Sequence, residues 1–239
     1  TRGRGWRGHQ CVRSLVAEHR HSQADAVGDA DAQAADAAPL EDLVDALVGA
    51  GVVPDVLTAL APHSADLRAS FVDGDGLTHR VFVGTRLTPT LARGSPVLTW
   101  LAEEGRHYAV AMVDPDAPSR ADPKMGEWLH WSVFNLRAPA RGHFSAQAWR
   151  RMLRRADVAT SYVGAAPPQQ TGPHRYVILL WEQPRGAIDM RHARRIDAAT
   201  ATGRARFSAR RFAADYGLGD PVGVAMFEAE WDPAVREIY

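Results

Sequence analysis

The chain has 239 residues, enough for one large β-rich domain or two smaller domains. Lys plus Arg and Asp plus Glu each number 28, so the net charge is zero and no global field attracts nucleic acid or an anionic membrane. Cys11 is the single cysteine, so no disulfide can form within the chain and no oxidising compartment is indicated. The strongly apolar runs, such as 176–181, are too short to span a bilayer.

The first 38 residues differ in composition from the rest. Five arginines occur among the first 20 residues, and the Ala/Asp-rich stretch "QADAVGDADAQAADAA" follows at 23–38. Such a composition buries little apolar surface, so we expect residues 1–38 to be a disordered leader before a single domain at 39–239. An organelle transit peptide is the alternative, because such peptides are rich in arginine. We therefore expect a cytoplasmic protein, or a mitochondrial one if the leader directs import.

The first regular element is predicted just after the leader. Apolar residues recur with helical spacing from Leu40 to Val48, and Glu41 and Asp42 suit the positive end of a helix dipole. Two glycines and Pro54 then end the pattern. We expect this helix to pack its apolar face on the domain.

Strand patterns dominate the remainder. Residues 67–71 alternate between apolar and polar, "DGDG" at 73–76 predicts a turn, and 77–84 return as a hairpin partner. Further strands are predicted at 96–100, 107–113, 129–136, 174–181 and 221–231. Two helices interrupt them, 145–156 capped by Ser145 and 208–218 capped by Ser208. The polar, Arg-rich segment 185–206 predicts a long surface loop. Short strands between Gly/Pro turns favour an all-β-dominated sandwich or barrel with peripheral helices.

Two proline-stiffened loops carry the candidate chemistry. One lies within 113–131 and presents Asp114 and His130; the other, within 162–176, ends at His174. Singly, Asp114 could be a turn residue and each histidine a core residue. Together, two imidazoles beside a carboxylate suit an oxyanion, because the carboxylate favours the charged ring and fixes its orientation. The expected ligand is the phosphate of a lipid headgroup or nucleotide. Trp128 and Tyr176 are expected to form the apolar rim of its pocket.

The same loops carry a family resemblance. "DPDAPSR" (114–120), "DPK" (122–124), "EWLHW" (127–131) and "YVGAAPPQQTGPHRYVILLWEQP" (162–184) closely resemble motifs of the phosphatidylethanolamine-binding protein (PEBP) family. That family includes the Raf kinase inhibitor protein and the fungal carboxypeptidase Y inhibitors, and "TGPHRYVILLWEQP" looks most like the fungal members. "VVPDVL" (52–57), "LTP" (87–89), "FSARRFA" (207–213) and "AEWDP" (229–233) extend the likeness over about 40–233.

The resemblance implies a sandwich of two antiparallel sheets with flanking helices, and a cis Ala117–Pro118 bond. It also implies an anion pocket, with no cofactor and no metal, formed by the matching Asp114, Pro118, Trp128, His130, Gly164, His174 and Tyr176. Met125 and Ala166 depart from the family pattern, where many relatives carry Tyr and Gly. The Arg-rich leader has no counterpart in these motifs.

Three functions follow as alternatives. The favoured one is a non-enzymatic binding and regulatory protein for a phosphate-bearing ligand or phospholipid headgroup, with a serine carboxypeptidase or a protein kinase as partner. A hydrolase or metal enzyme built on the Asp/His cluster is second, although the chain lacks a G-x-S-x-G elbow and any H-x-x-x-H or paired-cysteine spacing. A PEBP-like subunit of the mitochondrial ribosome is third, since an Arg-rich leader would suit import.

Overall fold

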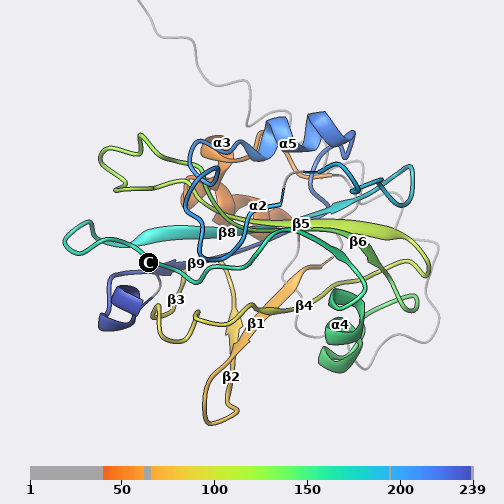
Figure 1. The fold of residues 1–239 in the computed structure, drawn as a ribbon, viewed down its shortest axis with the longest axis horizontal. Helices are drawn as coiled ribbons and strands as arrows, with labels where there is room; N and C mark the ends of the chain where they lie inside the picture. The colour runs from red at the N-terminus through yellow and green to blue at the C-terminus, as the bar shows by residue number, and fades with distance from the viewer. Residues whose placement is uncertain (1–39, 62–65, 194, 238–239) are drawn as a thin grey trace, which may run out of the picture.

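The computed structural model describes residues 40–61, 66–193 and 195–237. The leader predicted at 1–38 lies outside these residues. The described chain is dominated by strands arranged in two sheets with few helices, as the sequence predicted (Figure 1).

The smaller sheet has three antiparallel strands in the order β2-β1-β4. The hairpin predicted around "DGDG" is confirmed: β1 (Arg68–Val72) pairs with β2 (Thr78–Val81), and β4 (Val97–Thr99) lies on the other side of β1. Asp73 closes the turn, because one carboxylate oxygen accepts hydrogen bonds from the backbone N–H groups of Asp75 and Leu77. The other oxygen pairs with His79 on β2, at 2.8 Å.

The larger sheet has the order β3-β9-β8-β5-β6-β7. Its strands are β3 (Thr85–Arg86), β5 (His107–Asp114), β6 (Trp128–Arg137), β7 (Asp157–Thr160), β8 (His174–Glu182) and β9 (Gly223–Ala229). The short β3 pairs with β9 in parallel, so the expectation of two wholly antiparallel sheets is wrong at this edge. The central strand β8 is buried on both faces, which explains its unbroken apolar run.

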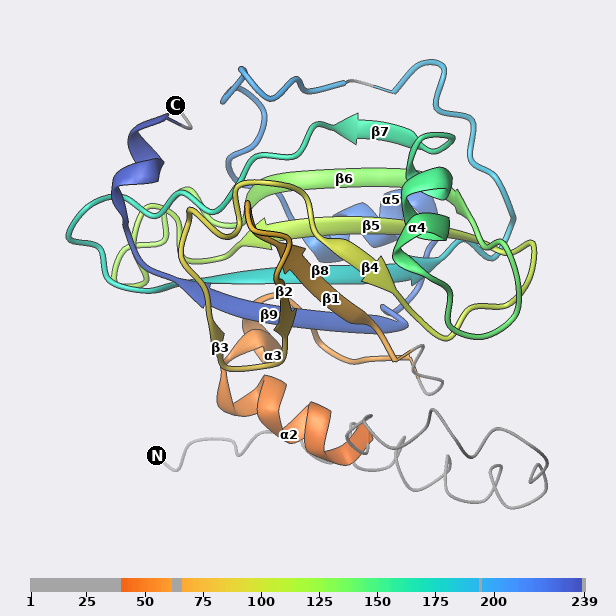
Figure 2. The ribbon, with the colours of Figure 1, turned by 90° about the horizontal axis from the view of Figure 1, so that it is seen from below.

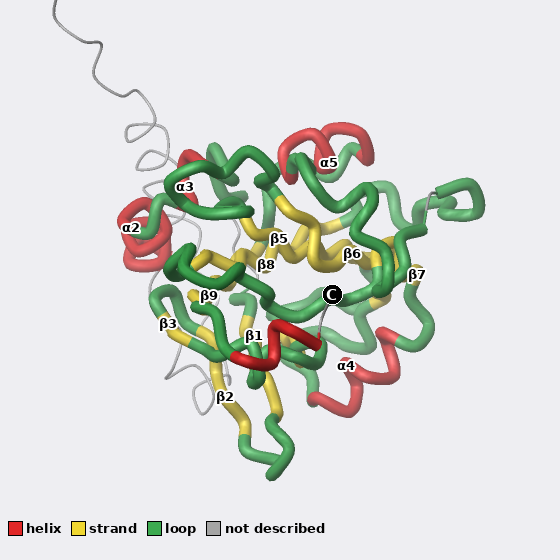
Figure 3. Tube along the Cα trace, turned by 60° about the vertical axis from the view of Figure 1, so that its left-hand side comes forward, coloured by secondary structure: helices red, strands yellow, loops and turns green. Residues whose placement is uncertain are grey.

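Each face of the larger sheet contributes to its own core. Alternate residues of β5 and β8, including Val110, Met112 and Ile178, pack against the smaller sheet. The intervening residues, including Ala111, Val113 and Val177, pack beneath the helices on the opposite face. Figures 2 and 3 show the resulting layers: β1, β2 and β4 on one side of the larger sheet, and α2, α3 and α5 on the other.

The helical layer follows the sequence pattern. Helix α2 (Leu40–Gly49) buries Val44 and Leu47 as predicted, and the short α3 (Val52–Asp55), which the pattern did not predict, follows it. Helix α5 (Ala209–Tyr216) is capped by Ser208, whose hydroxyl accepts from the N–H of Arg211. Gly217 ends α5 in the left-handed conformation that glycine adopts most easily. A 3₁₀ turn, η1 (Pro233–Glu237), ends the described chain.

Helix α4 (Ala146–Leu153) closes the side of the sandwich instead. Ser145 caps it, and its buried residues are Ala148, Trp149 and Met152. The indole Nε1 of Trp149 donates to the carbonyl of Pro96, 3.2 Å away, and the ring packs edge-on against Trp100. The helix is therefore attached rigidly to the end of the smaller sheet.

The prediction that 185–206 is wholly a surface loop is wrong at Arg204, which is completely buried. Its guanidinium is surrounded by carbonyl oxygens rather than by water: it donates five hydrogen bonds of 2.7–3.2 Å. The acceptors are the carbonyls of Leu129, His130, Ser161, Asp197 and Thr200. The loop is thus fastened to the start of β6, beside His130.

Replacing Arg204 with leucine should destabilise the protein by several kcal/mol, on the order of 3–5, because buried carbonyls lose their donors. Urea denaturation at neutral pH measures this. Arg185→Leu, an exposed arginine of the same loop, is the matched control and should shift the free energy of unfolding by about 0.5 kcal/mol or less. Equal stability of Arg204→Leu and Arg185→Leu would contradict the structural role of Arg204.

Candidate functional site

The carboxylate and the two imidazoles predicted from sequence lie at one end of the larger sheet. Asp114 is the last residue of β5, and His174 is the first residue of the neighbouring strand β8. Side chains alternate along a strand, so Asp114 shares the inter-sheet face with Met112, and His174 shares it with Tyr176 and Ile178. Antiparallel pairing therefore brings Asp114 and His174 together from positions 60 residues apart.

A β-bulge delivers His130 to the same face. The register between β5 and β6 slips at this point, since Met112 pairs with Trp131 whereas Val113 pairs with Leu129. As a result, His130 is the extra residue, and its ring meets that of Tyr176 edge-on at 5.2 Å between centroids. Because Tyr176 lies in the inter-sheet core, both histidines face the same side of the sheet.

The ring of His174 is held at both nitrogens. Nδ1 lies 2.8 Å from Oδ2 of Asp114, and Nε2 lies 2.9 Å from Oγ1 of Thr171. The Thr171 hydroxyl donates to the carbonyl of Pro168, so Oγ1 is placed to accept from Nε2. The ring is therefore held from opposite sides by two oxygen atoms. The other carboxylate oxygen of Asp114 accepts from the N–H of Asp116 at 2.7 Å, which fixes the aspartate.

His130 is buried as well. Its Nδ1 donates to the carbonyl of Val163, 2.9 Å away in the second loop. Burial lowers the pKa of His130 below its ordinary value, although the nearby charge of Asp114 opposes the shift. The two imidazoles therefore differ. His174 lies between two hydrogen-bonding oxygen atoms, whereas His130 favours its neutral form.

The remaining predicted residues surround these three in different ways. Pro118 is half-buried on the first loop and Trp128 is half-buried at the start of β6, and the Ala117–Pro118 bond is cis as predicted. Tyr176 was expected to form a rim, but it is fully buried and stacks on Phe227 at 5.1 Å. Its hydroxyl accepts from the N–H of Ala166 in the second loop, at 3.2 Å.

Gly164 has a packing role that the sequence did not show. A Cβ atom at this position would lie 2.9 Å from the carbonyl oxygen of Ala92 and 3.2 Å from Cα of Arg93. Because these are backbone atoms, they cannot move aside easily. Glycine therefore lets the second loop approach the segment before β4.

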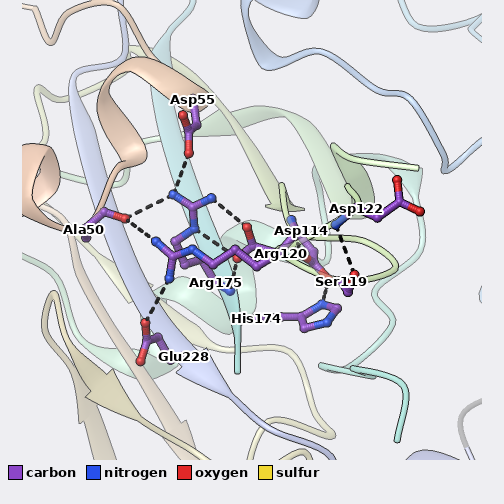
Figure 4. A network of polar contacts seen from close by, with 10 residues as sticks. Ala50, Asp55, Asp114, Ser119, Arg120, Asp122, His174, Arg175 and Glu228 are labelled. Carbon is purple, nitrogen blue, oxygen red and sulfur yellow. Dashed lines mark hydrogen bonds and ion pairs between the residues drawn. The ribbon is translucent and has the colours of Figure 1, made fainter. Parts of the chain in front are cut away.

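An ion pair that sequence reasoning missed holds the first loop in place. The backbone N–H and the side-chain Nε of Arg175 both donate to Oδ2 of Asp116, and Nη2 donates to Oδ1. Burial alone would raise the pKa of Asp116, but the hydrogen bonds from Arg175 hold it below its usual value. Nη1 of Arg175 also reaches the carbonyl of Ala50 and the carboxylate of Asp55 (Figure 4). The sequence signal was an arginine at the second position of an otherwise apolar strand.

Another acidic residue of the first loop, Glu127, joins this loop to α5. Its carboxylate is almost fully buried and accepts a hydrogen bond of 2.9 Å from the N–H of Ala209, the first residue of α5. Its carbonyl also accepts from the N–H of Phe207. Burial raises the pKa of Glu127 to about 7, although the hydrogen bond from Ala209 and the charge of Arg210 lower it.

Glu127 should make stability depend on pH. The folded state binds its proton more tightly than the unfolded state, so this contribution is fully present below about pH 4.5 and is lost as the pH rises through about 7. The shift corresponds to about 3 kcal/mol. We expect Glu127→Gln, which keeps an acceptor for Ala209, to gain stability over the wild type by roughly this amount as the pH rises over that range.

Denaturation of both proteins from pH 4 to pH 8 measures the difference, since other titrating groups are common to both. Glu104→Gln, at an exposed carboxylate, is the control and should follow the wild type throughout. A constant difference between Glu127→Gln and the wild type across this range would show that Glu127 has an ordinary pKa.

No group of three or more His, Cys, Asp or Glu side chains that could hold a metal ion occurs among residues 40–61, 66–193 and 195–237. Within the same residues, no helix is long and apolar enough to cross a membrane.

Comparison with known proteins identifies the family. The family model described as phosphatidylethanolamine-binding protein matches residues 69–226. The putative odorant-binding protein A5 of Drosophila melanogaster is 32% identical over 155 residues, which is 65% of this chain and 67% of that protein. The match covers well over half of the chain, so the chain belongs to the phosphatidylethanolamine-binding protein family, as its motifs predicted.

Solved structures show the same fold. Carboxypeptidase Y inhibitor, crystallised in complex with its cognate proteinase, superposes with a TM-score of 0.62 at 22% identity, over 80% of this chain and 96% of the inhibitor. The phosphatidylethanolamine-binding protein of Plasmodium vivax gives a TM-score of 0.60 at 18% identity, over 79% and 97%. The solution structure of CG7054 gives 0.55 at 35% identity, over 78% and 95%.

Proposed function

We propose that the protein is a non-enzymatic binding and regulatory protein whose site at Asp114, His130 and His174 recognises a small phosphate-bearing anion, such as a phospholipid headgroup. The observation that carries the proposal is the 2.8 Å contact between His174 and Asp114, with His130 close by on the same face. Membership of the phosphatidylethanolamine-binding protein family supports it.

The hydrogen bonds of the site suggest how an anion would bind. A phosphate oxygen that accepts from Nε2 of His174 takes the place of Thr171 Oγ1, whose hydroxyl keeps its own hydrogen bond to the carbonyl of Pro168. Asp114 remains behind the ring and fixes its orientation. His130, which favours the neutral form before binding, gains a proton when a negative charge approaches.

The hydrolase alternative has less support. Ser119 accepts from the N–H of Asp122 in its own loop, at 3.2 Å. Ser132 is buried on β6, in the strand pair with Thr160. Neither contact is the nucleophile–base hydrogen bond that activates a catalytic serine. A role in binding therefore fits the described contacts better than catalysis does. Cytoplasmic location, with mitochondrial import as the alternative, remains part of the proposal.

Phosphoethanolamine should bind the wild type and lose affinity as the pH rises, because the proton that His130 gains on binding becomes harder to acquire. His174→Ala and His130→Ala should each weaken binding about tenfold to a hundredfold, the value of one charge-assisted hydrogen bond. Isothermal titration calorimetry over a range of pH measures both effects.

His79→Ala supplies the matched control, because His79 forms a similar pair with Asp73, also at 2.8 Å, on the hairpin of the smaller sheet. This variant should bind like the wild type. Equal affinity in all four proteins, or affinity that rises with pH, would refute the anion site.

We also propose a protein partner of the serine carboxypeptidase class, with a protein kinase as the alternative. The solved structure of carboxypeptidase Y inhibitor with its proteinase suggests this class, although its 22% identity with this chain establishes the fold alone. A stoichiometric excess of the full chain should abolish peptide hydrolysis by a serine carboxypeptidase. Full peptidase activity at that excess would exclude this class of partner, and phosphotransfer assays would then test the kinase.

A further inference from the structure

The segment 128–156 contains six arginines and no acidic residue. Four of these arginines, Arg150, Arg151, Arg154 and Arg155, are exposed at the end of α4; we call them the α4 arginines. In a chain of zero net charge, this is a local concentration of positive charge. No ion pair involving these four side chains occurs within residues 40–61, 66–193 and 195–237.

The stability of α4 does not by itself explain why four arginines gather at its C-terminal end. One or two cations in a last turn favour the negative end of the helix dipole. However, Arg150 and Arg154 are four residues apart and Arg151 and Arg154 three apart, and like charges at these spacings repel on a helix. Asp157, the next carboxylate along the chain, has another partner, since it pairs with Arg195. The positive charge is therefore left for a partner outside the fold.

From this arrangement we propose that the α4 arginines form a docking surface for an anionic lipid membrane. Trp149 packs the opposite face of α4 against the sandwich, so the arginines project from a helix that is held in place. The other exposed residues of the helix include Ala146 and Gln147, with no large apolar side chain among them. Protein interfaces usually require an apolar core, whereas a negatively charged bilayer attracts arginines by electrostatics alone.

The docking surface and the anion site lie at opposite ends of the sandwich. Helix α4 follows the end of β6 that pairs with the start of β5, whereas Asp114 is at the other end of β5 (Figure 2). A bilayer bound at α4 therefore does not cover the end of the sheet that carries the anion site. Variants of the two sites should act independently.

Co-sedimentation of the full chain with vesicles tests the proposal. We expect binding to phosphatidylcholine vesicles that contain phosphatidylglycerol, weakening as salt rises, and little binding to phosphatidylcholine alone. Changing all four α4 arginines to glutamine should weaken binding by at least about a hundredfold, since each arginine contributes roughly fivefold. Changing all four to lysine should preserve most of the binding, because a membrane recognises charge rather than guanidinium geometry.

The control replaces Arg185, Arg191, Arg210 and Arg211 with glutamine, which removes the same charge from a different surface. It should bind like the wild type, and the leader is present in every variant. Thermal unfolding of the α4 glutamine variant should match or exceed that of the wild type, because repulsion is relieved. Equal losses in both glutamine variants, no loss in the α4 variant, or tighter binding to duplex DNA than to the vesicles would overturn the proposal.

Discussion

The buried ion pair between Arg175 and Asp116 is the constraint on which the arrangement of the site depends. It joins the loop after β5 to the start of β8. These two strands carry Asp114 and His174 at their neighbouring ends. Because Arg175 fixes Asp116, the backbone N–H of Asp116 is held where it donates to Asp114, and Asp114 in turn orients His174. Burying such a pair is costly unless its geometry is good, and three donated hydrogen bonds meet that condition.

The same guanidinium connects the site to the helical layer. It reaches the carbonyl of Ala50 after α2 and the carboxylate of Asp55 at the end of α3. Glu127 makes a second connection, from the first loop to the start of α5. The loops are therefore attached at several points to elements that pack on the far side of the sheet. A fixed arrangement of this kind suits recognition, since a preorganised site loses little entropy when its ligand binds.

Family membership and function rest on different observations. The order of the strands and the two proline-stiffened loops define the fold, and the fold is shared with proteins whose identity to this chain is about one residue in five. Function belongs to particular side chains placed on that fold. In this chain the Asp114–His174 pair lies at one end of the larger sheet, and the arginine-rich helix α4 lies at the other.

The sequence by itself determined the elements, because local patterns reflect local physics. Alternation predicted the β1–β2 hairpin, the apolar run at 176–181 lay within the predicted strand that became β8, and Ser145 and Ser208 marked the helix starts. It also identified Asp114, His130 and His174 as candidates. Only the tertiary structure decided that a bulge turns His130 toward Tyr176, that Arg204 is buried, and that Arg175 pairs with Asp116. These depend on register and on contacts between distant segments, which no local pattern of residues encodes.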